Sequence, residues 1–244
     1  PFPKVKARPC IFEYIYFSRP DSLVNNVSIY EYRKRLGAEL AKENHIKTDL
    51  IIPVPDSGVP AAIGYSESIK HNVELGIIRN HYVGRTFIEP TQQIRSLGVK
   101  LKHNVNKSLV KNKSLILIDD SLVRGTTSVK IVKMLYEAGA KEVHLRIAAP
   151  PIKYPDYYGV DTPNQDELLA AKLDLEGMRK FINVTTLQFL SIDGLYKAMG
   201  YQKRNSTYPQ FTDHCFTGEY PVKPVDASDK DFMSNKMSFM SSKI

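Results

Sequence analysis

Short apolar runs alternate along this chain with longer segments in which apolar residues recur at helical spacing. The runs are bounded by turn residues and have the length of strands that are buried on both faces. Strands are predicted over Leu50 to Val54, Val73 to Ile78, Leu115 to Ile118, Val143 to Ala149 and Thr186 to Leu190. Helices are predicted over Ser28 to Glu43, Pro60 to Ile69, Thr126 to Ala138, Asn164 to Ala171 and Asp193 to Met199. This alternation predicts an α/β fold, with a mainly parallel sheet and helices on both of its faces.

Two segments lie outside this alternation. The stretch from Arg79 to Asn112 is long, polar and interrupted by glycine, yet it lies between two predicted strands. Loops longer than ~15 residues in a compact domain are usually functional or disordered, so we expect a flexible lid loop here. From Val222 onward the chain is rich in Ser, Lys, Asp and Met without helical period, and we expect it to be poorly ordered.

The composition narrows the class of protein. With 244 residues the chain can bury a sizeable core without disulfides or a metal. Its apolar runs are far shorter than the roughly 20 residues that span a bilayer, so no membrane is expected as a partner. Two cysteines and no signal peptide indicate the reducing cytoplasm. The chain starts at Pro1 without an initiator methionine, and we expect that a part is missing upstream.

The net charge leaves several kinds of ligand open. A formal charge of +8 suits nucleic acid, an anionic membrane or a phosphorylated small molecule. The basic residues between Arg95 and Lys113 have no aromatic residues among them on which bases could stack. We therefore expect no nucleic-acid partner.

The segment from Leu115 to Ser128 carries the strongest chemical signal. It reads Leu-Ile-Leu-Ile-Asp-Asp-Ser-Leu-Val-Arg-Gly-Thr-Thr-Ser, which is a buried strand ending in two acids, then a small-residue loop that opens a helix. Ligands of open α/β sheets bind beyond the carboxyl ends of the strands, and free N–H groups at helix N-termini hold phosphate. Both features coincide here, which predicts a phosphate site.

The residue types in this loop divide into two groups. Hydroxyl donors come from Ser121, Thr126 and Thr127. Gly125 lets the backbone approach an anion, whereas Asp119 and Asp120 would repel phosphate and suit sugar hydroxyls or a magnesium ion. The alternative is a plain helix N-cap cluster, which two adjacent acids after a fully apolar strand disfavour. The Gly-Lys-Ser/Thr ending of a P-loop is absent.

Leu115 to Thr127 matches the thirteen-residue signature of phosphoribosyltransferases. Its part Asp-Asp-Ser-Leu-Val-Arg-Gly-Thr-Thr resembles the C-terminal transferase domain of the glutamine amidophosphoribosyltransferases. Further blocks agree with that family: Cys10 to Ser22, Ile52 to Tyr65, Asn80 to Pro90, Ala138 to Pro151, Tyr158 to Pro163 and Phe189 to Tyr196. The resemblance implies a type I phosphoribosyltransferase fold. It divides the chain into an opening segment, 1–27, that would join a glutaminase domain, a phosphoribosyltransferase domain, 28–200, and a partly disordered C-terminal extension, 201–244.

The resemblance also implies a role for each matching residue. The catalytic group would be Asp119, Asp120 and Lys102. The 5′-phosphate loop would contain Ser121, Val123, Arg124, Gly125, Thr126 and Thr127. The pyrophosphate loop and the lid, which would span Arg79 to Asn104, would contribute Asp56, Ser57, Gly58, Arg79 and Tyr82. Magnesium would be held by Ser57, Asp119 and Asp120, and Lys102 would contact pyrophosphate.

The implied reaction is displacement of pyrophosphate from phosphoribosyl pyrophosphate by ammonia, which gives phosphoribosylamine in the first step of purine synthesis. Ammonia needs no activated side chain, so stabilising the charge that develops on pyrophosphate would be the main electrostatic task. Closure of the lid would exclude water. The resemblance further implies purine nucleotides as inhibitors, a glutaminase domain or subunit as a partner, and a homo-oligomer.

The chain departs from the family at its cysteines. The glutaminase nucleophile of the family is an N-terminal cysteine, but this chain starts with Pro1 and Cys10 is internal, so we expect ammonia-dependent activity. Some relatives bind a [4Fe-4S] cluster through four cysteines. Cys10 and Cys215 occupy two of those places, but Asp156 and Thr212 occupy the others, so no iron–sulfur cluster is expected.

Two further features are a run of possible metal ligands and a histidine in the lid. Asp213, His214 and Cys215 suggest zinc, but three adjacent residues lack the spacing of ligands, so we expect a plain surface segment. His81 stands in the lid where many relatives have arginine.

Two rival functions stay open. A salvage phosphoribosyltransferase would share the phosphate signature, but the blocks Tyr82 to Pro90 and Phe12 to Ser22 count against it. A non-catalytic regulator that binds phosphoribosyl pyrophosphate or nucleotides is disfavoured because both acids, Ser57 and Lys102 are intact.

Overall fold

A parallel sheet of four strands forms the centre of the computed structural model, which describes residues 6–43, 45–80, 103–160, 162 and 164–222. The strand order is β3-β6-β7-β8. These strands are β3 (Leu50–Pro53), β6 (Ser114–Asp119), β7 (Glu142–Ile147) and β8 (Thr186–Phe189). In the register, Ile51 faces Ile116 and Leu117 faces Leu145. The predicted α/β fold is confirmed, and so is the parallel direction of these strands.

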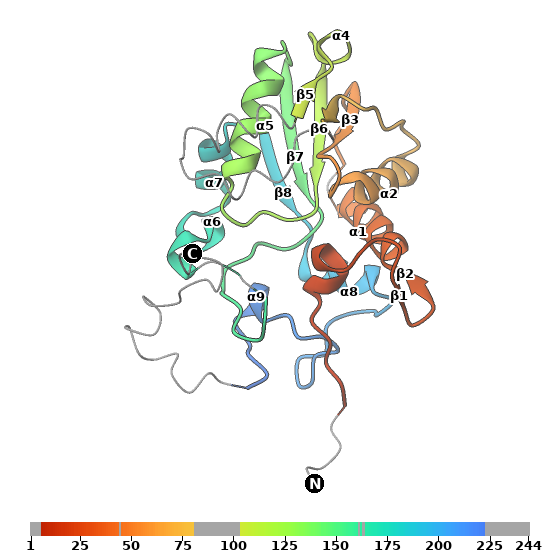
Figure 1. The fold of residues 1–244 in the computed structure, drawn as a ribbon, viewed down its shortest axis with the longest axis vertical. Coiled ribbons are helices and arrows are strands. Elements are labelled where there is room, and N and C mark those ends of the chain that lie inside the picture. Colours follow the sequence, from red (N-terminus) through yellow and green to blue (C-terminus); the bar gives the residue numbers. More distant parts are fainter. Residues whose placement is uncertain (1–5, 44, 81–102, 161, 163, 223–244) are drawn as a thin grey trace, which may run out of the picture.

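Helices lie on both sides of this sheet (Figure 1). Helices α1 (Ile29–Glu43) and α2 (Val59–Ile69) lie on one side, and α5 (Thr126–Glu137) and α7 (Leu175–Ile182) on the other. Helix α8 (Ile192–Ala198) packs against α1. Shorter elements are the π-helix η1 (Glu13–Phe17), the 3₁₀-helix η3 (Gln165–Glu167), α4 (Lys107–Val110), α6 (Leu169–Lys172) and α9 (His214–Thr217).

The apolar character of the strands explains why the sheet lies between two helical layers. In β6 the residues from Leu115 to Ile118 are all completely buried, which a strand with one solvated face would not allow. Helix α5 then ends as predicted, because Gly139 adopts a positive φ of 93° and Ala140 donates its N–H to the Leu135 carbonyl at 3.0 Å. Both ends of the β6 to α5 unit are thus set by local sequence.

The prediction of a buried strand over Val73 to Ile78 is wrong. Val73 makes a single parallel bridge to Ile51, and the chain then turns away, since Gly76 donates its N–H to the Glu74 carbonyl at 3.0 Å. The actual strand, β4 (Ile77–Arg79), pairs antiparallel with β5 (His103–Val105) in a separate small sheet. The polar Glu74 and Gly76 interrupt the apolar run, and this accounts for the difference.

The single helix predicted over Asn164 to Ala171 is also divided. Leu168 is extended, with ψ at 120°, and separates η3 from α6. Its side chain is fully buried, and the next residue, Leu169, donates its N–H to the Val123 carbonyl at 2.9 Å. Helix α7 was not predicted, although Asp174 caps it by accepting the N–H of Gly177 at 2.7 Å.

Segments from the two ends of the described chain lie together. Thr212 donates its N–H to the Pro9 carbonyl at 2.9 Å and accepts the N–H of Ile11 at 3.1 Å. The small antiparallel pair β1 (Leu23–Val24) and β2 (Val27–Ser28) follows the first segment. This long-range pairing places residues before α1 against residues after α8.

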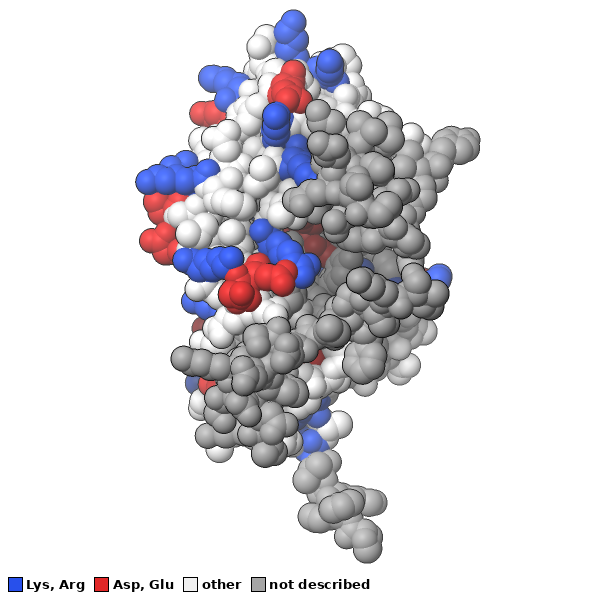
Figure 2. Space-filling model, turned by 60° about the vertical axis from the view of Figure 1, so that its left-hand side comes forward, with Lys and Arg blue, Asp and Glu red and all other residues white. Residues whose placement is uncertain are grey.

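Two further observations concern the helices and the surface charge. In the described part of the chain no helix is long and apolar enough to cross a membrane. On the face shown in Figure 2, basic and acidic side chains are intermixed. The face in Figure 2 is therefore not a continuous basic surface of the kind that binds nucleic acid.

Candidate active site

Two loops meet beyond the carboxyl ends of β3 and β6 and enclose a cavity of about 410 Å³. The first loop follows β3 and the second runs from β6 into α5. The cavity is lined by Phe12, Tyr16, Phe17, Val54, Pro55, Ser57, His103, Thr162 and the ten residues from Asp119 to Ser128. This is the position at which open α/β sheets bind ligands.

Asp119 and Asp120 lie at the floor of this cavity, and each is 7% exposed. Asp119 Oδ1 accepts the Ser57 hydroxyl at 3.1 Å and the backbone N–H of Asp120 at 2.9 Å. Asp120 Oδ1 accepts the Ser121 hydroxyl at 3.1 Å, whereas its buried Oδ2 has no hydrogen-bond partner among the described residues. One carboxylate oxygen is thus left for a ligand.

Burial dominates the electrostatics of the two acids. It raises the pKa of Asp119 well above its usual 3.8, and the adjacent Asp120 charge raises it further. Burial also raises the pKa of Asp120 to about 6, although hydrogen bonds from Ser121 and the positive charge of Arg33 oppose the rise. A cation bound between these carboxylates would relieve this cost.

The donor set fits magnesium. The carboxylates of Asp119 and Asp120 and the hydroxyl of Ser57 offer hard oxygen ligands, which Mg²⁺ prefers. Within the described residues no group of three or more His, Cys, Asp or Glu side chains could hold a metal by itself. In the usual magnesium site one or two carboxylates act together with substrate oxygens and water.

The second loop places the N-terminus of α5 at the cavity. Gly125 is the residue before the helix and adopts a φ of 75°, a left-handed conformation that glycine tolerates best. Among the described residues no side chain caps this helix end, so its first N–H groups are available to an anion. The predicted phosphate loop therefore has the geometry of an anion site, with Ser121, Val123, Arg124, Thr126 and Thr127 all lining the cavity.

This loop is supported from outside by residues that the sequence did not reveal. Leu169 bonds to the Val123 carbonyl, and Arg124 donates to Glu167 at 2.7 Å. A Cβ at Gly125 would lie 2.8 Å from Leu169 Cδ2 and 3.4 Å from a ring carbon of Phe181. The guanidinium of Arg124 is thus engaged outward, and glycine at position 125 lets the loop pack against α6 and α7.

The loop after β3 brings Ser57 to the acids. Val54 donates its N–H to the Ile118 carbonyl at 2.8 Å, which attaches the loop to the end of β6. A Cβ at Gly58 would lie 2.3 Å from that same carbonyl oxygen, so only glycine fits here.

Asp56 and Arg79 form an ion pair with each other, and neither they nor Gly58 line the cavity. Lys102 and Tyr82, as well as His81, lie outside the described residues.

An aromatic wall was missed in the sequence. Phe12, Tyr16 and Phe17 line the cavity, and their ring centroids lie 5.4 to 6.2 Å apart. The run from Ile11 to Phe17 contributes both to the core and to the cavity. Its residues Ile11 and Ile15 are fully buried, whereas Tyr16 and Phe17 are 51% and 47% exposed.

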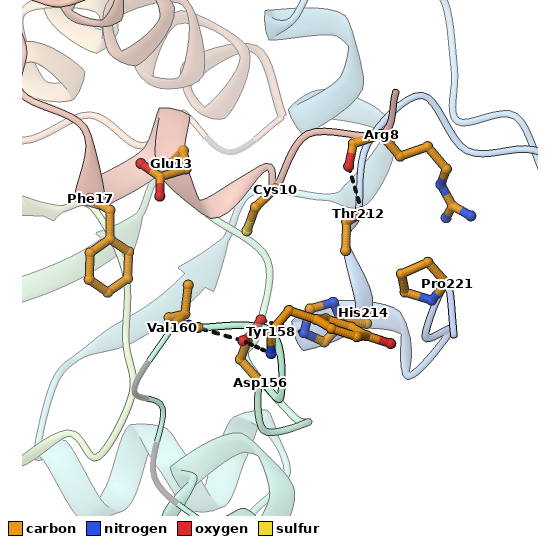
Figure 3. A pocket seen from close by; sticks show the side chains of 11 residues that line it. Arg8, Cys10, Glu13, Phe17, Asp156, Tyr158, Val160, Thr212, His214 and Pro221 are labelled. Carbon is orange, nitrogen blue, oxygen red and sulfur yellow. Dashed lines mark hydrogen bonds and ion pairs between the residues drawn. The ribbon is translucent and has the colours of Figure 1, made fainter. Parts of the chain in front are cut away.

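A second cavity, of about 420 Å³, lies beside Cys10 (Figure 3). Cys10, Asp156, Thr212 and His214 are among the residues that line it. Both cysteines are free thiols, and burial raises the pKa of the Cys215 thiol. Asp156 accepts the N–H groups of Tyr158 and Val160, and these bonds, with His214 nearby, lower its pKa although burial opposes this.

The prediction of a plain surface segment at residues 213–215 is wrong. Asp213 and His214 are each 1% exposed. Asp213 accepts the Tyr196 hydroxyl at 2.7 Å and the Arg204 guanidinium at 2.6 Å, and His214 Nε2 lies 2.7 Å from Asp156 Oδ2. Tyr196, Arg204 and Asp156 surround these two side chains, and no local pattern reveals these contacts.

The comparisons with known proteins agree with this geometry. The model of the phosphoribosyl transferase domain matches residues 21–160, which include both loops of the site. The chain therefore belongs to the phosphoribosyl transferase domain family.

Within that family the chain is similar to amidophosphoribosyltransferases. It is 55% identical to the enzyme of Rhizobium etli over 96% of this chain and 47% of that protein, and 47% identical to the enzyme of Bacillus subtilis over 88% of this chain and 45% of that protein. The solved structure of glutamine phosphoribosylpyrophosphate amidotransferase from B. subtilis, complexed with ADP and GMP, matches with a TM-score of 0.79 and 47% identity, over 88% of this chain and 47% of that one. The chain thus spans about half the length of these relatives.

Proposed function

We propose that the chain transfers the phosphoribosyl group of 5-phosphoribosyl 1-pyrophosphate to ammonia and forms 5-phosphoribosylamine, as in the first step of purine synthesis. The observation that carries this proposal is the meeting of two buried acids, the Ser57 hydroxyl and the open N-terminus of α5 around one cavity. The names of its relatives support the same reaction.

In this proposal the phosphate of the substrate lies at the N-terminus of α5. The free N–H groups there and the hydroxyls of Ser121, Thr126 and Thr127 bind it, while Gly125 lets the backbone come close. Asp119 and Asp120 then face the ribose, because they occupy the cavity floor at the end of β6. Their carboxylates orient the two ribose hydroxyls and hold C1 in position for attack.

The bond changes are those of a displacement. The nitrogen of ammonia forms a bond to C1, the bond from C1 to the pyrophosphate oxygen breaks, and the nitrogen releases one proton to solvent or to the departing pyrophosphate. Ser57, Asp119 and Asp120 would hold magnesium together with substrate oxygens, and the ion would offset the negative charge on pyrophosphate. Lys102 is proposed as a further contact of pyrophosphate.

The nitrogen source and the regulation belong to this proposal as well. The ammonia would come from solution or from a glutaminase domain or subunit. Purine nucleotides would inhibit by occupying the phosphate site, which the ADP and GMP in the B. subtilis structure support. The proposed setting is the cytoplasm, and the proposed assembly is a homo-oligomer.

The test is release of pyrophosphate from phosphoribosyl pyrophosphate and magnesium, with ammonium at alkaline pH, a purine base, or glutamine as the acceptor or donor. Release that depends on ammonium supports the proposal. Release with a purine base alone would indicate a salvage enzyme instead. A folded chain that binds nucleotide but releases no pyrophosphate would favour a regulator.

A further inference from the structure

Arg33 is a buried arginine directly behind the aromatic wall of the cavity. It lies on α1 and is 6% exposed. Its Nε donates to the Tyr14 carbonyl at 3.1 Å, and its Nη2 donates to the carbonyls of Tyr16 and Ser18 at 2.7 and 2.8 Å. One guanidinium therefore donates hydrogen bonds to three backbone carbonyls of a single turn.

That turn needs a donor from elsewhere. The last carbonyls of a helix have no partner within the helix, and η1 ends at Phe17 with Ser18 in an extended conformation. Ser18 donates its own N–H to the Glu13 carbonyl, which leaves the carbonyls of Tyr14, Tyr16 and Ser18 to Arg33. The planar fork of arginine can serve several acceptors at once with little loss of freedom.

The turn carries the wall of the candidate active site. Tyr16 and Phe17 line the cavity, but each ring is about half exposed, so packing alone does not fix their position. Their backbone is fixed instead, because Arg33 donates hydrogen bonds to the carbonyls of Tyr14, Tyr16 and Ser18. A shift of the turn would therefore shift the wall relative to the acids on the cavity floor.

The charge of Arg33 also faces the site. Burial lowers its pKa, but the negative charge of Asp120 raises it, and the positive charge of Arg33 in turn favours the ionised form of Asp120. Among the described residues no carboxylate forms an ion pair with Arg33. Arg33 thus donates hydrogen bonds to the backbone that carries the aromatic wall, and it interacts electrostatically with Asp120 on the cavity floor.

We infer that Arg33 is a positioning residue that sets the aromatic wall, so that ammonia and not water reaches C1 of the bound sugar. This inference rests on the proposed function and deepens it, since it assigns the choice of nucleophile to a residue that does not line the cavity. Attack by water on C1 would release the same pyrophosphate and one proton but would yield ribose 5-phosphate. The wall would suppress that product by excluding water.

The experiment compares transfer with hydrolysis in the chain and three variants. Pyrophosphate release is measured with phosphoribosyl pyrophosphate and magnesium, with and without ammonium, and ribose 5-phosphate is quantified separately. Arg33→Gln removes the fork, Arg33→Lys keeps the charge, and Arg35→Gln is the matched control, because Arg35 lies exposed on the same helix. Thermal unfolding reports the folded fraction of each variant.

For Arg33→Gln we expect the ratio of transfer to hydrolysis to fall on the order of 10- to 100-fold, the range that a displacement of about 1 Å produces. KM for phosphoribosyl pyrophosphate should change little, because the phosphate loop is untouched. Arg33→Lys should recover part of the ratio, and Arg35→Gln should match the unmodified chain. If Arg33→Gln does not fold, the partial loss in Arg33→Lys carries the test.

An unchanged ratio in the Arg33 variants of an active chain would overturn this inference and leave the proposed function standing. Transfer and hydrolysis that fall together with the folded fraction would also overturn it, since a merely structural arginine gives that result. An unmodified chain that releases no pyrophosphate with ammonium would overturn the proposed function itself, and the inference with it.

Discussion

Replacing Asp120 by asparagine should stabilise the fold at alkaline pH. The carboxyl group is 7% exposed, its Oδ2 has no partner among the described residues, and burial raises its pKa from 3.8 to about 6. A raised pKa means that the folded chain binds protons more tightly than the unfolded chain. Stability is therefore lost as the pH rises from about 4 to 6, and it does not return at higher pH.

The pKa values give the size of the effect. At pH 8 the ionised carboxylate costs the folded state about 3 kcal/mol, because each unit of pKa corresponds to about 1.4 kcal/mol. At pH 4 most of this cost is absent. Asparagine has a similar shape and no charge, so Asp120→Asn should be more stable than the unmodified chain by up to about 3 kcal/mol at pH 8 and by much less at pH 4.

The assay is unfolding by urea, with EDTA present and substrate absent, at pH 8 and pH 4. Asp166→Asn is the matched control, because Asp166 is exposed, and it should show no comparable gain at either pH. A free energy of unfolding for Asp120→Asn equal to or below that of the unmodified chain at pH 8 would refute the reasoning. It would mean that the carboxylate is stabilised in the folded state by groups that the structure does not show.

Two other substitutions test the surroundings of the site. Gly125→Ala should destabilise the chain by about 1–2 kcal/mol, because φ at this position is 75°, and should raise KM for phosphoribosyl pyrophosphate. Gly200→Ala is the control, because Gly200 has a similar φ of 87° but open space around it, so this change should affect stability alone. An unchanged KM in Gly125→Ala would contradict the role of the loop. Asp156→Asn should cost roughly 1–3 kcal/mol at pH 7, measured by urea unfolding, because it weakens the contact with His214. Since the pKa of Asp156 is lowered, this difference should be fully present above pH 3.8 and decrease as the pH falls below it, and a difference that stays constant between pH 7 and pH 3 would count against the contact with His214.

The sequence predicted those parts of the structure that depend on local pattern. The β6 to α5 unit is predicted almost to the residue, because a fully apolar strand, two acids, a loop with Gly125 and a helix stop at Gly139 follow one another directly. The approach of Ser57 to Asp119 came from family resemblance and not from pattern, because 62 residues separate the two.

The misses depend on contacts between distant segments. The aromatic wall at Tyr16 is positioned by Arg33, which lies 17 residues further along the chain, and the buried His214 lies against Asp156. An apolar run such as Val73 to Ile78 does not reveal by itself which sheet it joins. Hydrophobic pattern gives the class of element, but tertiary pairing decides the partner.

The central claim is that the Asp119 and Asp120 site carries out phosphoribosyl transfer to ammonia. The most direct test measures pyrophosphate release from phosphoribosyl pyrophosphate and magnesium, with ammonium at alkaline pH, for the chain and for Asp119→Asn. The account predicts ammonium-dependent release by the unmodified chain and its loss in the variant, with both proteins folded. Equal release by the two proteins, or no release by the unmodified chain, would contradict it.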